Sequence, residues 1–369
     1  MAIESVKALV GAGYRVIVTV PGPGPLIQMM TDIGATVVEQ PTPIVRRGLL
    51  SPKGLLQLIG ETVSSWGPML RLITHTNAGT VLVNTVTPPL WFVVGRFARR
   101  SVVCHVHEAE SKTSVLLRKA LYVPLVLCQR VVVNSRFTLE VLAQAASAAA
   151  KKARIVHNAV PGPAEVVPPR PDLKGPVRIV YVGRLSHRKG PHVLVEAAGH
   201  LRDRGRDIAL ELVGAVFPGN EGYESELRDR VSALGLDEAV TFTGFQPTVW
   251  GALARSDIAV MPSVSDESFG NAAVEAALAA RPLIAAEIPG IMEATEPITS
   301  RVVVPPGDSA ALADAVERIV DDWADYAARA VSDSKTVART YSQERYAEGL
   351  IAALGLAELA QRSSGTQRS

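Results

Sequence analysis

Cysteines, long apolar runs and metal-binding clusters are scarce in this chain of 369 residues. Its two cysteines, Cys104 and Cys128, have no zinc or redox spacing and sit in apolar surroundings, so we expect buried thiols in a reducing compartment. The apolar run 120–128 contains Pro124 and is too short to span a bilayer. Residues 1–7 lead into an amphipathic helix without the apolar core of a signal peptide. These features predict a cytoplasmic protein, free in solution or peripheral at the inner membrane face.

Two common motifs are also missing. No Gly-x-Gly-x-x-Gly fingerprint follows a first strand, which argues against a nicotinamide-dependent dehydrogenase. No Asp-x-Asp pair is present to hold a diphosphate through a divalent ion. We therefore expect neither a metal site nor a cofactor.

The formal net charge is only +2, but it is unevenly distributed. Residues 1–150 hold 14 Lys and Arg against 7 Asp and Glu, a net of +7, whereas residues 151–369 hold 24 against 29, a net of −5. Either this is chance surface charge, or the first half meets an anionic partner such as a membrane surface, a lipid phosphate or an acidic sugar. We expect no nucleic-acid partner. The residues of the candidate lipid patch are Arg46, Arg47, Arg96, Arg99, Arg100, Arg118 and Lys119.

Apolar strands alternate with helical stretches in both halves of the chain, a pattern typical of parallel sheets covered on both faces. The sequence predicts an α/β fold with two Rossmann-like, doubly wound domains facing a cleft, and ligands at the carboxyl ends of the strands. The predicted parts are an N-terminal domain at 1–160, a Pro- and Gly-rich hinge at 161–176, a second domain at 177–340, and a C-terminal helix and polar tail at 341–369. The predicted strands fall within 14–22, 79–85, 101–108, 130–135, 153–160, 177–183, 208–214, 239–244, 257–263, 282–286 and 301–305.

Two cations follow the first strand of the second half. That strand ends at Gly183, Arg184 and Lys189 come next, and Gly190 precedes a helix with proline in its first turn. An isolated pair of this kind more often consists of solvent-exposed cations on a surface loop without a ligand. Beside a helix N-terminus at a strand's carboxyl end, it is suited to bind phosphates.

A second polar segment follows the strand "SDIAVMPS". Glu267 falls on the loop, Ser268 is a plausible helix cap, and the amides of Phe269, Gly270 and Asn271 mark the helix start. Glu275 lies about one turn further along. On a single helix the two glutamates would be about 12 Å apart along the axis, so they are read as separate contacts to one extended ligand. Carboxylates suit neighbouring hydroxyls, so the two segments together predict a site for a nucleotide-activated sugar.

These residues carry a close resemblance to a known family. The stretches "GRLSHRKG", "ESFGNAAVE", "RPLIAAEIPGIME" and "VVVPPGDSAALADAV" occur in the order and spacing of the retaining GT-B glycosyltransferases with the E-x7-E signature, known as group 1 or family 4. "VVVNSRFTLEVL" and "IVHNAV" are similar to the end of that family's first domain. The resemblance covers about residues 102–354.

The resemblance implies roles for individual residues. Arg184 and Lys189 would hold the donor diphosphate, Glu267 would bond hydroxyls of the transferred sugar, and Glu275 would bond the ribose. The amides of Phe269, Gly270 and Asn271 would assist Glu267. The base-contacting loops would contain Gly214, Gly244 and Phe245. Where the family usually has Gly-Gly, this chain has Pro289-Gly290.

His105 and His107 occupy one face of the strand "SVVCHVHE" if it extends that far. Three interpretations remain open. The two could be a metal-binding pair, although no third ligand is evident nearby. They could be structural histidines. Or His107 could be the family's strand-end histidine beside the reacting sugar carbon. Of the other histidines, His187 alone has a setting in which it could touch a ligand.

The resulting expectation is a metal-independent hexosyltransferase of the retaining type. It would move a sugar from a UDP- or GDP-linked donor to an acceptor hydroxyl on a glycan, a lipid-linked or a small molecule in glycan biosynthesis. The alternatives are a non-catalytic or truncated relative that binds nucleotide sugars, and a GT-B epimerase or phosphorylase.

One expected element is missing from the beginning of the chain. In the family, the helix at the start of "MAIESVKALVGAGYRVIVTV" is preceded by a first strand and a glycine-rich loop. Because that strand is central in a doubly wound sheet, its absence would leave two strands without a backbone partner. Either the true start lies further upstream, the explanation we favour, or the chain is a degraded, inactive copy. The prediction is that the chain folds poorly or is inactive as given, and that upstream codons encode the strand and loop.

Overall fold

The computed structural model describes residues 1–45, 52–109 and 114–356. The contacts divide the chain into two compact units, and we describe each by itself. Unit 1 is Met1–Ala159 together with the segment from Gln343 onward, and unit 2 is Val160–Ser342. The Arg46–Arg47 part of the predicted lipid patch lies outside the described residues.

Unit 1 contains two parallel sheets. One pairs β1 (Ile17–Val20) with β2 (Thr36–Glu39), and the other has the order β3 (Thr80–Val83), β4 (Ser101–Val106), β5 (Arg130–Val133) and β6 (Ala153–Ile155). Within the described residues the two sheets are not joined by a strand ladder. The expected loss of a central first strand stays a prediction. The short strand β2 was not anticipated, because only Val37 and Val38 form its apolar run.

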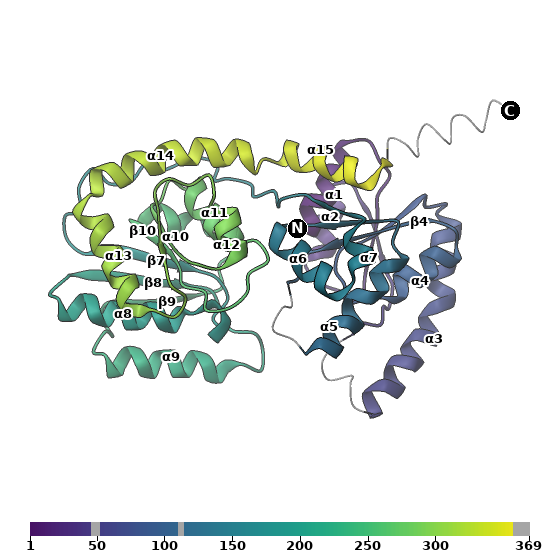
Figure 1. Cartoon of the computed structure of the whole chain (residues 1–369), viewed down its shortest axis with the longest axis horizontal. Coiled ribbons are helices and arrows are strands. Elements are labelled where there is room, and N and C mark those ends of the chain that lie inside the picture. Colours follow the sequence, from purple (N-terminus) through teal and green to yellow (C-terminus); the bar gives the residue numbers. More distant parts are fainter. Residues whose placement is uncertain (46–51, 110–113, 357–369) are drawn as a thin grey trace. The chain divides into compact units, whose positions relative to one another are not determined.

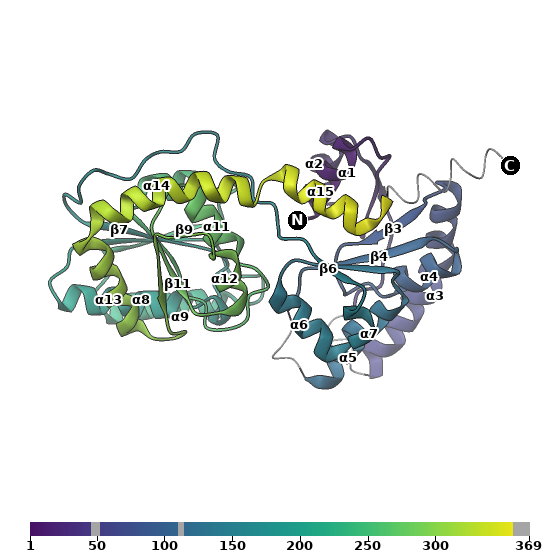
Figure 2. The same ribbon diagram turned by 45° about the horizontal axis from the view of Figure 1, so that its top comes forward.

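Helices cover both faces of the four-stranded sheet. One apolar cluster joins it to α3 (Pro52–His75), α4 (Leu90–Phe97), α6 (Arg136–Ala145) and α7 (Ser147–Ala150), and another joins it to α1 (Ala2–Gly11) and α15 (Gln343–Leu354). The short α2 (Leu26–Asp32) packs on β2, and α5 (Val115–Tyr122) leads into the 3-10 turn η2 (Val123–Leu127). In Figures 1 and 2, α15 runs beside α1, although the two are separated by most of the sequence.

Unit 2 has one continuous, fully parallel sheet of six strands. Their order is β12 (Arg301–Val304), β11 (Leu283–Ala286), β10 (Ile258–Met261), β7 (Val177–Val182), β8 (Ile208–Val213) and β9 (Val240–Gly244). The strands lie within the segments predicted from the sequence.

The helices of unit 2 form two layers. One core lies under α8 (Pro191–Asp203), α9 (Glu221–Ala233) and α13 (Ser309–Asp321). The other lies under α10 (Trp250–Arg255), α11 (Asn271–Leu278), α12 (Pro289–Ala294) and α14 (Trp323–Thr340). Figure 1 shows α8 and α9 on the opposite side of the sheet from α11 and α12. Strands with helices on both faces are the architecture expected for near-continuous β-branched runs.

Candidate functional site

The strand order of unit 2 reverses between β7 and β10. The chain runs from β7 outward through β8 and β9, then returns to place β10 on the other side of β7. At such a switch point the loops that follow the two strands diverge and leave a crevice at their carboxyl ends. A small pocket is found here, lined by residues that include Lys189, Ser263, Glu267, Gly270 and Ile291.

Glu267 lies at the centre of this crevice, with an exposed fraction of 7%. Its Oε1 forms an ion pair with Lys189 Nζ at 2.7 Å and accepts a hydrogen bond from Arg188 Nη1 at 2.8 Å. Arg188 Nη1 also donates to the carbonyl of Asp266 at 2.5 Å. The carboxylate is therefore fixed by charge-assisted bonds from the loop after β7. Arg188 was not singled out from the sequence, because it looks like one more polar residue between Arg184 and Lys189.

Arg184 is held on the other side of the same loop. Its guanidinium lies over the ring of Phe217, 3.5 Å from the centroid, a cation–π contact with the loop after β8. The hydroxyl of Tyr181 donates to the Arg184 carbonyl at 2.6 Å. Partial burial and the adjacent positive charge of Arg188 lower the pKa of Arg184. Three cations thus occur within six residues of this loop, and two of them, Arg188 and Lys189, contact Glu267.

Two glycines allow the loops to approach each other this closely. Gly190 is left-handed, with φ of 69°, and a Cβ there would lie 2.0 Å from the carbonyl oxygen of Pro262. A Cβ on Gly290 would lie 1.9 Å from the carbonyl oxygen of Glu267. In the Pro289-Gly290 pair, the glycine therefore lets the backbone of Glu267 approach, because it has no Cβ. Pro289 is the first residue of α12.

The helix start after Glu267 differs from the sequence expectation in one detail. The cap of α11 is Gly270, with φ of 98°, rather than Ser268. Glycine takes this left-handed conformation without steric cost, so the chain turns sharply into the helix. Gly270, Ala272 and Ala273 bring the positive end of α11 to the pocket wall.

The remaining predicted residues of this segment have different surroundings. Phe269 is buried, and its ring packs edge-on against Tyr341 with centroids 5.3 Å apart, so its side chain is not available to a ligand. Asn271 is the first residue of α11. Glu275 is half-buried inside the same helix, and burial raises its pKa to about 7 although Lys189 acts in the opposite direction.

Gly214 and Gly244 lie at the carboxyl ends of β8 and β9. The amide of Gly214 donates to the carbonyl of Gly244 at 2.9 Å, and a Cβ on Gly214 would lie 1.8 Å from the carbonyl oxygen of Gly183. The ends of three strands are thus drawn together beside Arg184. Phe245 follows with an exposed fraction of 76%.

His107 is placed in unit 1, at the carboxyl end of β4. Its Nε2 lies 3.0 Å from Asn84 Oδ1, at the end of the neighbouring strand β3. Burial lowers the pKa of His107 to about 3. His105 is fully buried, with its ring centroid 3.9 Å from that of His107, and burial lowers its pKa well below the usual value. Among the described residues no group of three or more His, Cys, Asp or Glu is arranged to hold a metal ion.

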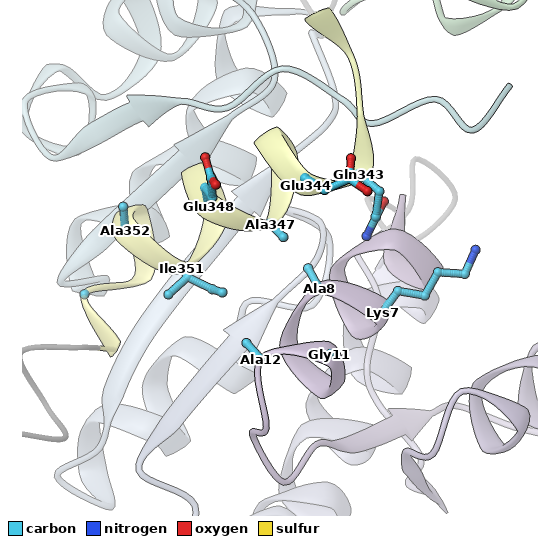
Figure 3. Close-up of a pocket in the computed structure, with 11 residues that line it drawn as sticks. Lys7, Ala8, Gly11, Ala12, Gln343, Glu344, Ala347, Glu348, Ile351 and Ala352 are labelled. Carbon is cyan, nitrogen blue, oxygen red and sulfur yellow. The ribbon is translucent and has the colours of Figure 1, made fainter. Parts of the chain in front are cut away.

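A larger groove, of about 790 Å³, lies in unit 1 between α1 and α15. Figure 3 shows Ala8 of α1, and Ala12 just after this helix, facing Ala347 and Ile351 of α15, with Lys7 pointing away. None of the predicted site residues lines this groove, and its walls are mostly small and apolar. In the part of the chain that is described, no helix has the length and apolar character needed to cross a membrane.

The fold and the crevice define a class of protein: a two-unit α/β protein with a pocket of paired cations and a carboxylate at the switch point of the six-stranded sheet of unit 2. Two family models match it. "Glycosyltransferase Family 4" matches residues 1–161, and "Glycosyl transferases group 1" matches residues 170–337. Together they account for most of the sequence, and the chain belongs to this glycosyltransferase family.

Similar proteins of known function are glycosyltransferases. The chain is 34% identical to the 2-deoxystreptamine glucosyltransferase of Streptomyces kanamyceticus over 198 residues, 50% of this chain and 49% of the relative. It is also 34% identical to the D-inositol 3-phosphate glycosyltransferase of an Arthrobacter species over 152 residues, 40% of this chain and 35% of the relative. The matches thus span about half the length of these relatives or less.

The fold of the whole chain has solved counterparts. The structure of HepE from Anabaena, in complex with UDP and glucose, superposes with a TM-score of 0.78. It covers 96% of both chains at 20% sequence identity. At this identity the likeness establishes the GT-B fold and no more.

Proposed function

We propose that the protein is a retaining glycosyltransferase that moves a sugar from a UDP- or GDP-linked donor to an acceptor hydroxyl. The observation that carries this proposal is the coordination of Glu267 Oε1 by Lys189 and Arg188 at the switch point, beside the N-terminus of α11. A nucleotide sugar has the complementary groups, a diphosphate for the cations and hydroxyls for the carboxylates.

The proposed roles follow from this complementarity. Arg184 and Lys189 contact the diphosphate and stabilise the negative charge that develops as it leaves. Glu267 accepts hydrogen bonds from hydroxyls of the transferred sugar, and Glu275 accepts them from the ribose. The nucleotide base is contacted by Gly214, Gly244 and Phe245, since the loops after β8 and β9 lie beside Arg184.

The proposed chemistry needs no covalent enzyme intermediate. The acceptor oxygen attacks the anomeric carbon on the face from which the diphosphate departs, the bond from that carbon to the phosphate oxygen breaks, and a donor phosphate oxygen takes the acceptor proton. The guanidinium and ammonium groups provide the positive charge that a divalent ion provides in other transferases. The reaction is therefore proposed to be metal-independent, and unchanged turnover in EDTA is the expected result.

The donor is tested by binding and by product stereochemistry. Screening UDP, GDP and their sugars for a rise in melting temperature identifies the nucleotide. NMR of the product should show the anomeric configuration of the donor retained, and inversion contradicts the proposal. A non-catalytic relative would show the thermal shift without donor hydrolysis or transfer.

The proposed acceptor side includes a membrane contact for a lipid-linked acceptor. Helix α3 exposes Leu56, Ile59 and Val63 at 71%, 52% and 72%, and α4 exposes Phe97 at 65% beside the exposed Arg96. Apolar side chains next to cations favour an anionic bilayer surface. Flotation with anionic liposomes at low and high salt tests this contact, and no binding at low salt contradicts it.

A further inference from the structure

His107 and Asn84 come from the carboxyl ends of two adjacent strands. β3 ends at Val83 and β4 at Val106, and the two strands pair directly, so the residues that follow them are neighbours. The His107 Nε2 to Asn84 Oδ1 distance of 3.0 Å is a hydrogen bond of ordinary length. The two residues lie 23 positions apart in the sequence, and nothing in the sequence pattern pairs them.

The backbone that carries His107 is held in place by its neighbours. The amide of His107 donates to Glu108 Oε2 at 3.1 Å, and the hydroxyl of Thr85 donates to the same carboxylate. The hydroxyl of Tyr122 donates to the Glu108 carbonyl at 2.9 Å. The ring of His105, tilted by 45° with its centroid 3.9 Å away, limits rotation of the His107 imidazole.

The hydrogen bond to Asn84 determines which ring nitrogen of His107 carries the proton. Burial keeps the imidazole neutral at physiological pH, so it has one N–H and one lone pair. An amide oxygen only accepts, so the proton belongs on Nε2 and the lone pair on Nδ1. Nδ1 is buried and has no hydrogen-bond partner among the described residues.

We propose that Asn84 is a positioning residue that holds His107 in the Nε2–H tautomer, so that Nδ1 accepts a hydrogen bond from a hydroxyl of the bound sugar. This inference rests on the proposed transferase function. The buried Nδ1 lacks any other partner in the described residues, and leaving an acceptor buried and unpaired is costly, which favours a ligand hydroxyl as its partner.

The test begins with a readout that needs no turnover. Long-range ¹H–¹⁵N NMR of histidine-labelled protein reports the tautomer of each imidazole. We expect the Nε2–H form of His107 in the wild type and loss of this preference in Asn84→Ala. Asn84→Asp keeps an acceptor oxygen and should keep the tautomer. An Nδ1–H form in the wild type, or an unchanged tautomer in Asn84→Ala, overturns the inference.

The second readout links the tautomer to the ligand. The nucleotide sugar identified by the thermal screen should shift the Nδ1 resonance upfield, and the nucleotide diphosphate without sugar should not. Asn84→Ala should lower kcat about tenfold or more with a smaller change in KM, and Asn84→Asp should recover part of it. A sugar-independent Nδ1 shift, or full activity of Asn84→Ala, contradicts the positioning role.

A matched control separates this role from a general loss of structure. Asn77 lies before β3, at the amino end of the same strand, is exposed and has a positive φ of 49° that glycine tolerates. Asn77→Gly should leave both the tautomer and kcat unchanged. If no sugar nucleotide is turned over, the proposed function fails, while the wild-type and Asn84→Ala spectra still decide the tautomer.

Discussion

The two units have the same α/β construction but handle polar groups in opposite ways. In unit 2 the candidate site concentrates charge, since Lys189 and Arg188 bind Glu267 directly and Arg184 stands nearby. In unit 1 the candidate His107 is buried and neutral, and its ring partner is the uncharged amide of Asn84. A charged leaving group needs the first environment, and an uncharged hydroxyl suits the second.

The sheets differ in a related way. Unit 2 has one continuous sheet whose strand ends converge at β7 and β10, with glycines allowing backbone contact between loops. Unit 1 has its strands in two separate ladders within the described residues. The charged site therefore depends on closely fitted loops, whereas the histidine site depends on a pair of neighbouring strand ends.

The largest expected effect is loss of the phosphate cation. Lys189→Ala should lower transfer about 100-fold, because the ammonium stabilises charge on the leaving diphosphate and also fixes Glu267. Steady-state kinetics measures the change. Lys174→Ala is the matched control, since that lysine of the same unit is 87% exposed and pairs only with Asp172 at the surface. Near-wild-type transfer by Lys189→Ala would remove its phosphate role.

The next effect tests the fit between the loops. Gly290→Ala should lower transfer at least tenfold, because a Cβ 1.9 Å from the carbonyl oxygen of Glu267 must displace that residue. Gly222→Ala in α9 is the control, since its Cβ meets nothing within 4 Å. Kinetics and melting curves of both variants check the prediction. If Gly290→Ala matched Gly222→Ala in both, the position of Glu267 would not depend on this contact.

The third effect is the pH dependence of nucleotide binding, which we expect from Glu275 in unit 2 and not from His107 in unit 1. With a pKa of about 7, the Glu275 carboxyl is mostly protonated at pH 6 and mostly ionised at pH 8. If the ionised form accepts both ribose hydrogen bonds, as proposed, nucleotide affinity should rise with pH, by about tenfold between pH 6 and 8. Calorimetric titrations measure it.

Two variants assign that pH dependence. Glu275→Gln should remove the rise that the carboxyl causes, while any rise from the nucleotide phosphates remains. His107→Gln should lower turnover but keep the whole rise, because a group with a pKa of about 3 does not titrate in this range. If nucleotide affinity no longer rose with pH in His107→Gln, the titrating group would be His107 in unit 1 and not Glu275 in unit 2.

The smallest effect concerns Arg188. Arg188→Ala should lower turnover only a few-fold, because Lys189 still holds Glu267 and the Arg188 side chain is 45% exposed to screening solvent. Arg202→Ala, at a surface pair of similar exposure in α8, is the control. A loss as large as that of Lys189→Ala would show that Arg188 itself binds the diphosphate.

The alternation of strands and helices and the order of the motifs could be predicted from the residues alone, and so could the presence of Lys189, Glu267 and Gly270 at the ends of the strands. These are local properties: a β-branched run, a Gly-Pro helix start or a glutamate after a strand has the same meaning wherever the chain carries it. The strands of unit 2 and the loop positions of Arg184 and Glu267 follow from such patterns.

The three-dimensional fold fixes which of these residues meet and in what protonation state. It buried Phe269 against Tyr341, brought Arg188 to Glu267 across 79 positions, and placed Asn84 against His107. It also raised the pKa of Glu275 and lowered that of His107. The physical reason is that burial and close approach depend on atoms contributed by distant segments, and the order of residues along the chain does not contain those distances.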